Sequence, residues 1–295
     1  MQDPKDTVAA AFRTVQDRIC AFLAEEDQPY REDAWSYAGG SGGGITRVWE
    51  GGPLLEKGGV GFSAIEGKSL PPSAATQFKI APGTPFHATG VSLVMHPRNP
   101  HVPTIHMNIR HFQAGEVSWF GGGVDVTPYY PGEAQVVGFH RALRDLCALH
   151  GHDYQAYKEA CDAYFFLKHR NEPRGIGGLF FDHLQNGHEA DLAFTEALGL
   201  AFPDLYRPFL AGRNTPVTET QRDFQLYRRS RYVEFNLLWD RGTLFGLQSG
   251  GRTESILMSM PPLAKWVYGF QAEPGSPEER LTGYFLQPRD WAGSK

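Results

Sequence analysis

The residues best suited to chemistry gather in one stretch of this 295-residue chain, between Phe86 and Tyr130. The stretch holds five of the eleven histidines: His87, His96, His101, His106 and His111. It also holds Arg110, and Asp125 close behind three consecutive glycines. Imidazole exchanges protons near neutral pH and is a common metal ligand, while a guanidinium matches carboxylates. These residue types predict binding of a polyanionic small molecule, with acid–base chemistry.

Alternation with a period of two residues places these side chains on a β-hairpin. The first strand puts Val91, Leu93 and Met95 on one face, and Ser92, Val94 and His96 on the other. After a proline-rich turn, the return strand alternates more sharply. Its apolar face holds Ile105, Met107 and Ile109, and its polar face holds His106, Asn108 and Arg110. On an edge strand, contact with solvent would explain such a polar row. On a sheet covered by helices, the same row would indicate a functional site.

A third strand over residues 117–120 leads into Gly121, Gly122 and Gly123, and Asp125 follows. Glycine lets a ligand approach the backbone closely, or lets the chain adopt a positive φ. We expect the strand to break here, which would present Asp125 as a catalytic carboxylate. The alternative is a turn-forming aspartate, and the pattern does not separate the two.

Two further histidines fall on the apolar stripes of expected helices. His140 lies in a helix over residues 133–150, and His169 in a second helix that begins at Asp153. Inward histidines can converge on a metal ion, although a buried histidine bonded to a backbone carbonyl is the commoner case. Both interpretations stay open at this point.

Composition excludes several classes of protein. A net charge of −5 and a pI near 6.1 disfavour general nucleic-acid binding. No apolar run approaches the roughly 20 residues that span a bilayer, so membrane insertion is not expected. Three scattered cysteines without a CxxC pair, Cys20, Cys147 and Cys161, are typical of core thiols in a reducing compartment. The N-terminal segment carries Asp3 and Asp6 and lacks the apolar core of a signal peptide, so we expect a cytoplasmic protein.

Several cofactor and catalytic motifs are missing from the sequence. The glycine run at residues 39–44 lacks the Gly-Lys-Ser/Thr of a phosphate loop, and residues 59–64 (GVGFSA) lack the βαβ context of a dinucleotide site. There is no nucleophile elbow, HExxH pair or iron-type facial pattern. We interpret both glycine runs as tight turns between strands.

The remaining pattern predicts an α+β protein with one domain over residues 1–295. A helix over residues 4–25, capped by Asp3 with Pro4 in its first turn, precedes a loop over residues 27–44. Further strands are expected at residues 45–50 and 59–65, and a hairpin at 232–239 and 243–247. The basic stretch 221–231 is expected to be a solvated face. Strands joined by short turns outnumber crossover helices, which favours a large, mostly antiparallel sheet covered by helices.

Long strings of this sequence resemble the oxygen-dependent coproporphyrinogen III oxidases. The strings are residues 87–94 (HATGVSLV), 96–100 (HPRNP), 106–110 (HMNIR), 119–130 (WFGGGVDVTPYY), 167–182 (LKHRNEPRGIGGLFFD), 224–229 (FQLYRR), 231–247 (RYVEFNLLWDRGTLFGL) and 250–262 (GGRTESILMSMPP). They follow the family order over roughly residues 30–292 and are far more specific than a short motif.

The resemblance implies a large, rather flat antiparallel sheet sandwiched between helices on both faces, a three-layer α/β/α arrangement. It also implies a homodimer, for which we expect contacts through residues 232–267. The implied reaction is the oxidative decarboxylation of two propionate groups of coproporphyrinogen III to vinyl groups, giving protoporphyrinogen IX for haem synthesis. Dioxygen is the oxidant, carbon dioxide and hydrogen peroxide leave, and no flavin, nicotinamide or haem takes part.

The resemblance also assigns residues. Arg110 and Arg252 match positions that hold propionates. Other substrate contacts match Ser92, Asn108, Ile109 (through its backbone alone), Gly250 and Gly251. Asp125 matches a carboxylate expected to accept hydrogen bonds from pyrrole N–H groups, and His106 matches the general acid–base.

A metal ion is a further implication. Bacterial members of the family imply a divalent ion, with manganese favoured, at positions that match His96, His106, His140 and His169. Four imidazoles without a carboxylate are unusual ligands for Mn²⁺, which prefers oxygen.

Two other functions stay open. A tetrapyrrole carrier needs the arginines but has no use for Asp125 or His106. A metal-dependent oxygenase that acts on another polycarboxylate needs an open iron site. Oxygen uptake with coproporphyrinogen separates the three possibilities.

Overall fold

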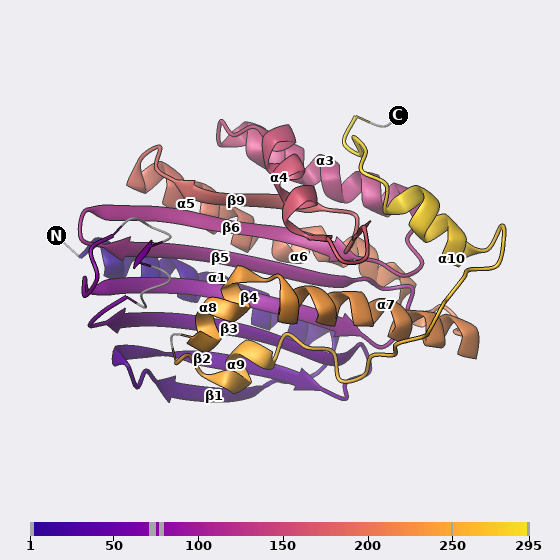
Figure 1. Cartoon of the computed structure of the whole chain (residues 1–295), viewed down its shortest axis with the longest axis horizontal. Helices are drawn as coiled ribbons and strands as arrows, with labels where there is room; N and C mark the ends of the chain where they lie inside the picture. Colours follow the sequence, from indigo (N-terminus) through magenta and orange to yellow (C-terminus); the bar gives the residue numbers. More distant parts are fainter. Residues whose placement is uncertain (1–2, 71–74, 77–79, 249, 294–295) are drawn as a thin grey trace.

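The computed structural model describes residues 3–70, 75–76, 80–248 and 250–293. At its centre lies a seven-stranded antiparallel sheet with the strand order β1-β2-β3-β4-β5-β6-β9 (Figure 1). The strands are β1 (Arg31–Ser36), β2 (Gly40–Glu50), β3 (Leu55–Gly67), β4 (Phe86–Pro97), β5 (Thr104–Ala114), β6 (Val117–Thr127) and β9 (Gly178–Leu184). β7 (Phe166–Leu167) and β8 (Glu172–Pro173) form a separate small hairpin. The predicted α+β class with a large antiparallel sheet is confirmed.

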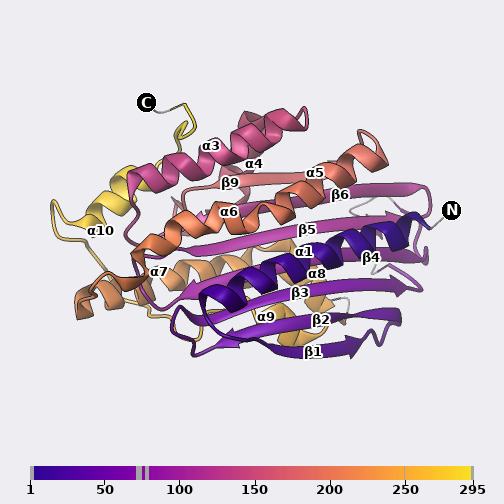
Figure 2. The ribbon, with the colours of Figure 1, turned by 180° about the vertical axis from the view of Figure 1, so that it is seen from behind.

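Helices cover both faces of this sheet. On one face, hereafter the α1 face, lie α1 (Pro4–Glu26), α5 (His188–Leu200) and α6 (Phe202–Tyr206), as Figure 2 shows. On the other, the α7 face, lie α7 (Glu219–Leu238), α8 (Arg241–Gln248) and α9 (Thr253–Leu257), which are in front of the strands in Figure 1. α4 (Tyr154–Tyr164) packs on β9, while α3 (Glu133–Leu149), α10 (Pro277–Arg280) and a π-helical turn (Leu281–Phe285) lie toward the β9 edge. A 3₁₀ segment (Arg207–Asn214) follows α6. No helix of the described residues is both long and apolar enough to cross a membrane.

The α1 face holds the main hydrophobic core. α1 begins as predicted, because the side chain of Asp3 accepts a hydrogen bond from the backbone N–H of Lys5 at 3.0 Å, and Pro4 opens the helix. The apolar stripe of α1 is buried in the same cluster as alternate residues of β4 and β5: Val91, Leu93, Met95, Ile105, Met107 and Ile109. The alternation predicted for the central hairpin is therefore confirmed, and it directs the polar residues to the α7 face.

Residues 27–44 were predicted to be loop, but they contain β1 and the first half of β2. β1 pairs with β2, and the glycines of β2 continue the pairing against β3. The backbones approach so closely that a Cβ on Gly43 would lie 2.1 Å from the backbone oxygen of Trp35. Glycines carry no alternation of side chains, so this strand left no periodic signal in the sequence.

The predicted hairpin over residues 232–247 is wrong, since this segment forms the end of α7 and then α8. α7 starts with a capping box, in which Thr218 and Gln221 exchange side-chain and backbone hydrogen bonds. Buried residues surround much of its axis, including Phe224, Tyr227, Tyr232 and Phe235. Such a helix has no single apolar stripe, and its short apolar runs imitate a strand.

The basic first half of α7 is buried, so the prediction of a solvated face is also wrong. Arg228 and Arg229 are 1% and 0% exposed. Arg229 pairs with Glu56 at 2.7 Å, and Arg228 and Arg231 pair with Glu172 at 3.2 and 2.8 Å. Buried charges need such partners, and these partners come from distant segments that a local pattern does not include.

Candidate active site

The polar residues predicted on the central hairpin lie side by side on the α7 face. Backbone pairing aligns Ser92 with Asn108, and it places Asp125 of β6 opposite His106. The structure brings together five predicted site residues: Ser92, His106, Asn108, Arg110 and Asp125. Ile109 points away as predicted, because its side chain is fully buried in the core of the α1 face.

Glycines make this part of the sheet a flat floor. Along the same rows, the strands present six glycines to the α7 face: Gly44, Gly59, Gly61, Gly90, Gly121 and Gly123. Glycines leave room for a ligand to lie close to the backbone. Met258, just after α9, covers part of this floor, since a Cβ on Gly59 would lie 2.6 Å from its Sδ atom. The glycines of β3 therefore face the segment that follows α9.

His106, Asp125 and Arg174 form one hydrogen-bonded group at the edge of the floor. Nδ1 of His106 lies 2.8 Å from Oδ1 of Asp125, and Nη2 of Arg174 donates to both carboxylate oxygens at 2.7 Å. An ionised carboxylate only accepts hydrogen bonds, so Nδ1 of His106 carries the proton. Nε2 has no hydrogen-bond partner among the described residues, and the His106 side chain is 21% exposed. One ring nitrogen therefore stays available to a ligand.

Asp125 lies inside a strand and not at a strand break. β6 runs without interruption from Val117 to Thr127, so neither a break nor a turn-forming role applies. Burial acts to raise the pKa of Asp125, but the charge of Arg174 and the contact with His106 outweigh it, and the pKa lies below its ordinary value. The buried group is thus an anion whose charge acts on His106.

Arg174 was not among the predicted site residues. It is placed by the segment before β9, which approaches β6 so closely that a Cβ on Gly175 would lie 2.0 Å from the backbone oxygen of Val126. Its only signal in the sequence is the glycine-rich string after it, Gly175-Ile176-Gly177-Gly178. That string predicts close backbone packing, but it does not say against which strand.

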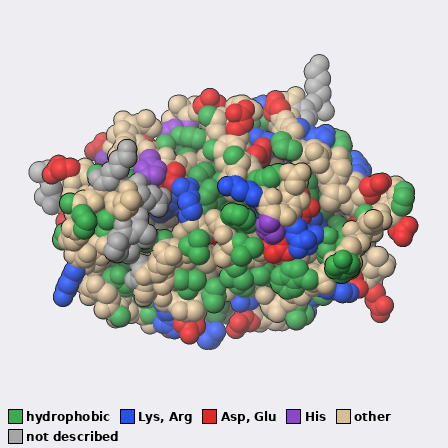
Figure 3. Space-filling view, in the orientation of Figure 1, with side chains coloured by type: hydrophobic (Ala, Val, Ile, Leu, Met, Phe, Trp, Pro, Cys, Tyr) green, Lys and Arg blue, Asp and Glu red, His purple; other side chains and the backbone are tan. Residues whose placement is uncertain are grey.

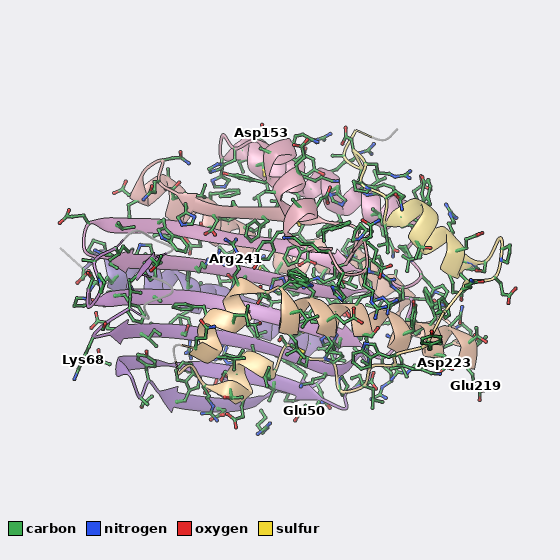
Figure 4. All side chains as sticks on the ribbon, in the orientation of Figure 1. Glu50, Lys68, Asp153, Glu219, Asp223 and Arg241 are labelled. Carbon is green, nitrogen blue, oxygen red and sulfur yellow. The ribbon has the colours of Figure 1, made fainter. Side chains whose placement is uncertain are left out.

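Two arginines share one carboxylate beside the floor. Arg110 lies 3.0 Å from Oδ1 of Asp182 in β9, and Arg241, the first residue of α8, lies 3.5 Å from Oδ2. Figure 4 labels Arg241 over the middle of the sheet. Asp240 holds the start of α8, because its carboxylate accepts hydrogen bonds from the N–H and hydroxyl of Thr243 at 2.8 and 2.7 Å. Sequence reasoning missed Arg241, since the predicted hairpin placed it in a turn.

The remaining predicted substrate contacts lie at the opposite edge of the sheet. Arg252 precedes α9 and pairs with Asp33 of β1 at 2.5 Å. Gly250 and Gly251 come just before it, and Gly250 has a φ of 72°, which favours glycine. Asp33, the partner of Arg252, lies in β1, and Arg110 lies in β5. These strands are four strand spacings apart, which is about 19 Å. These residues do not form one cluster, but they flank a floor broad enough for a large flat ligand.

The four histidines predicted to bind a metal ion do not come together. His96 and His140 are fully buried, and both ring nitrogens of each have protein partners, one of which is a backbone carbonyl. Burial lowers the pKa of His140 to about 3 and that of His96 well below its ordinary value. Both therefore match the alternative of a core histidine bonded to the backbone.

His169 lies outside any helix. α4 ends at Tyr164, so His169 falls in the turn between β7 and β8, where it bonds Glu234 at 2.7 Å and Trp239 at 2.9 Å. Among the described residues, no group of three His, Cys, Asp or Glu side chains could hold a metal ion. The four predicted histidines thus do not fit a shared divalent ion.

A cavity of about 460 Å³ lies elsewhere, at the ends of β2 to β5. Its lining includes Lys5, Ser41, Lys68 and His87, and none of the residues of the floor. We therefore do not assign the predicted chemistry to it.

Comparisons with known proteins agree with the arrangement on the α7 face. The family model described as "Coproporphyrinogen III oxidase" matches residues 7–291. The chain is 52% identical over 314 aligned positions to the "Oxygen-dependent coproporphyrinogen-III oxidase" of Dictyostelium discoideum, which covers 97% of this chain and 94% of that relative. Both matches span every strand of the floor and the helices above it. This chain belongs to the coproporphyrinogen III oxidase family.

Proposed function

We propose that this protein oxidatively decarboxylates two propionate groups of coproporphyrinogen III to vinyl groups, with dioxygen as the oxidant, and so forms protoporphyrinogen IX for haem synthesis. One observation carries the mechanism: His106 keeps Nε2 free while Asp125 holds Nδ1 at 2.8 Å, beside a glycine floor flanked by arginines. A tetrapyrrole carrier would need the arginines but not this pair. An iron oxygenase would need an open ligand set, and no group of three His, Cys, Asp or Glu side chains in the described part of the chain could form one.

His106 exchanges protons with the substrate in this mechanism. Because Nδ1 carries a proton, Nε2 is the nitrogen that accepts one from a pyrrole N–H group. Proton loss makes the ring electron-rich enough to reduce dioxygen without flavin, nicotinamide or haem. Each propionate then loses its carboxylate as carbon dioxide, a proton from the carbon next to the ring, and two electrons. Dioxygen takes the two electrons with that proton and one from solvent to become hydrogen peroxide.

Asp125 supports His106 in this proposal. Its side chain is 2% exposed and both of its oxygens accept hydrogen bonds from Arg174. Its charge therefore stabilises the imidazolium that forms when His106 accepts a proton. The direct contact of Asp125 with pyrrole N–H groups stays a prediction.

The arginines bind the carboxylates of the macrocycle. Arg110 and Arg241 can exchange Asp182 for a propionate, and Arg252 can do the same with Asp33 across the floor. Ser92 and Asn108 lie on the floor between them, and Gly250 and Gly251 offer backbone contacts. Since Met258 covers the floor, we expect α8 and α9 to move when the substrate enters.

Oxygen uptake tests this function. Anaerobically prepared coproporphyrinogen III is mixed with enzyme and oxygenated buffer, and oxygen, carbon dioxide and the product porphyrin are measured together. We expect two carbon dioxide molecules per macrocycle and a vinyl product. Binding without oxygen uptake would identify a carrier, and oxygen uptake only with added iron and another polycarboxylate would identify the oxygenase.

A divalent metal ion, manganese included, has no supporting site at the four histidines. His96, His140 and His169 each use their ring nitrogens for protein contacts, so we route no step through a metal. We propose that dioxygen is the only co-substrate.

We also propose a homodimer that uses the apolar surface around α8 and the following segment. Ten of the twelve exposed large hydrophobic side chains of the described residues lie between Leu237 and Phe270. Figure 3 shows hydrophobic side chains gathered over this part of the α7 face. Residues 232–247 form helices and not the expected hairpin, but an exposed apolar surface of this kind marks protein contacts.

A charge in that surface tests the dimer. Trp266 is 55% exposed, and Trp266→Glu should convert a dimer to a monomer in sedimentation analysis. The matched control is Leu149→Glu, because Leu149 is 80% exposed and lies at the end of α3. A wild-type monomer at micromolar concentration contradicts the proposal.

We propose a cytoplasmic location. Cys20, Cys147 and Cys161 are free and buried, which is typical of proteins from a reducing compartment. Cell fractionation with an antibody tests this.

A further inference from the structure

We propose that Arg174 is a positioning residue for the reaction: it fixes the orientation of the Asp125 carboxylate, so that His106 presents Nε2 to the substrate. The inference rests on the proposed function of His106. It adds Arg174, a residue outside the predicted site, which is 1% exposed and bonds Asp125 from within the protein.

The hydrogen bonds of the Arg174 side chain go to Asp125. A single nitrogen, Nη2, reaches both carboxylate oxygens at 2.7 Å, whereas Nε is buried without a partner. His106 occupies one of the same oxygens through Nδ1. Arg174 bonds both oxygens of the Asp125 carboxylate, and His106 bonds Oδ1 as well. The carboxylate therefore has little freedom to rotate, and its orientation sets the position of the His106 ring.

Three aromatic rings hold the guanidinium in place. Its central carbon lies 4.0 Å from the ring centre of Phe165, 4.6 Å from that of Phe235 and 4.7 Å from that of Tyr232. Phe165 also meets the ring of His106 edge-on at 5.8 Å. Burial strengthens both the cation–π contacts and the ion pair, because the local dielectric constant is low. The same wall therefore positions both ends of the His106–Asp125–Arg174 group.

A purely structural role explains this arrangement less well. Replacing a buried ion pair by apolar residues is often neutral for stability, so the pair is weak evidence of a folding role. Arg229 is as deeply buried, but among the described residues the carboxylate of its partner Glu56 bonds only Arg229 and Arg222, both from α7. The partner of Arg174 instead bonds a histidine with an open ring nitrogen.

Steady-state kinetics of Arg174→Gln and Arg174→Lys tests the proposal. Loss of a charge-assisted hydrogen bond predicts that kcat falls roughly 10- to 100-fold in Arg174→Gln. KM should change less than about threefold, because Arg174 does not touch the substrate. Arg174→Lys should recover part of kcat, since one ammonium nitrogen can replace the single bridging Nη2.

Arg47 supplies the matched control. It is 6% exposed, pairs with Asp17 and Glu32, and lies 4.9 Å from the ring centre of Tyr30. It resembles Arg174 in burial, charge pairing and ring contact, but β2 directs it to the α1 face. Arg47→Lys and Arg47→Gln should lower the melting temperature without lowering kcat at a temperature where the protein is folded.

A nuclear magnetic resonance signal separates positioning from folding. In protein with ¹⁵N-labelled histidine, the bonded Nδ1 proton of His106 should be observable in wild type and in Arg174→Lys, and lost or shifted in Arg174→Gln.

An unchanged signal or an unchanged kcat in folded Arg174→Gln overturns the inference. If Arg174→Gln does not fold, the same two measurements on Arg174→Lys decide. A displaced Nδ1 signal with an unchanged kcat overturns the inference, and changes in both the Nδ1 signal and kcat support it. Wild-type protein that does not consume oxygen refutes the proposed function itself.

Discussion

The two faces of β5 carry alternate residues of one short segment and have different roles. On the α1 face, Ile105, Met107 and Ile109 are fully buried under α1. On the α7 face, His106, Asn108 and Arg110 stay partly exposed beside glycines. Packed side chains fill the first face, whereas the second keeps polar side chains beside glycines. Substitutions on the two faces should therefore separate the free energy of unfolding from kcat and KM.

Truncation on the α1 face should give the largest effect. Met107→Ala removes a fully buried side chain and leaves a cavity, so we expect the free energy of unfolding to fall by about 2–5 kcal/mol. Urea unfolding followed by circular dichroism measures this. Below the unfolding transition, kcat should stay near its wild-type value, although Met107 lies between His106 and Asn108 in the sequence. A large loss of kcat in folded protein would show that the faces are not independent.

Asp125→Asn should give the largest kinetic effect on the α7 face. The substitution is nearly isosteric but removes the charge that stabilises protonated His106, so we expect kcat to fall by roughly two powers of ten or more. Substrate should still bind, because Asp125 is 2% exposed and its carboxylate oxygens bond His106 and Arg174. Oxygen uptake measures kcat, and fluorescence of a bound porphyrin measures affinity. A kcat near wild type would remove Asp125 from the mechanism and leave His106 without its support.

Arg252→Ala should mainly weaken binding. A lost charge-assisted hydrogen bond amounts to about 1.5–3 kcal/mol, so KM should rise by about one to two powers of ten, with kcat less affected. Asp33→Asn is the matched control, because it removes the partner of Arg252 and keeps the guanidinium. If Arg252→Ala and Asp33→Asn raise KM by the same factor, the ion pair between these residues determines KM, and a contact of Arg252 with propionate does not.

Removal of metal ions should have the smallest effect. Because His96, His140 and His169 hold protein partners, dialysis against a chelator should leave kcat within about twofold of its starting value, the range of ordinary preparations. Metal analysis and oxygen uptake on the same sample test this. A stoichiometric ion whose loss abolishes activity would contradict the geometry at these histidines.

Alternation predicted the central hairpin well. Each apolar residue of β4 and β5 that recurs at every second position lies on the α1 face, and the polar row between them lies on the α7 face beside the glycine floor. Register follows from this pattern, because a shift by one residue would bury His106, Asn108 and Arg110 in the core. The same rule correctly directed the Ile109 side chain away from the site.

Helix and strand assignments failed where burial on several sides removed the pattern. α7 has protein on more than one side, so its apolar residues do not form a stripe and its arginines are not solvated. β2 failed for the opposite reason, since four glycines carry no side chains to alternate. His169 was misplaced because α4 ends at Tyr164, one turn earlier than its apolar spacing suggested.

The sequence by itself determined the family, the antiparallel sheet and the face on which His106, Asn108 and Arg110 lie. These depend on local spacing and on long matching strings, which a single chain displays in full. Only the tertiary structure shows that Asp125 bonds both His106 and Arg174, that Arg241 lies beside Arg110 on Asp182, and that His96, His140 and His169 use their ring nitrogens for protein contacts. Those outcomes depend on hydrogen bonds between residues far apart in the chain: Arg174 and Asp125 are 49 positions apart, and His96 and Ser259 are 163 apart. A periodic pattern in the sequence does not predict which distant group forms a hydrogen bond with a buried nitrogen, because the packing of the helices and strands determines that partner.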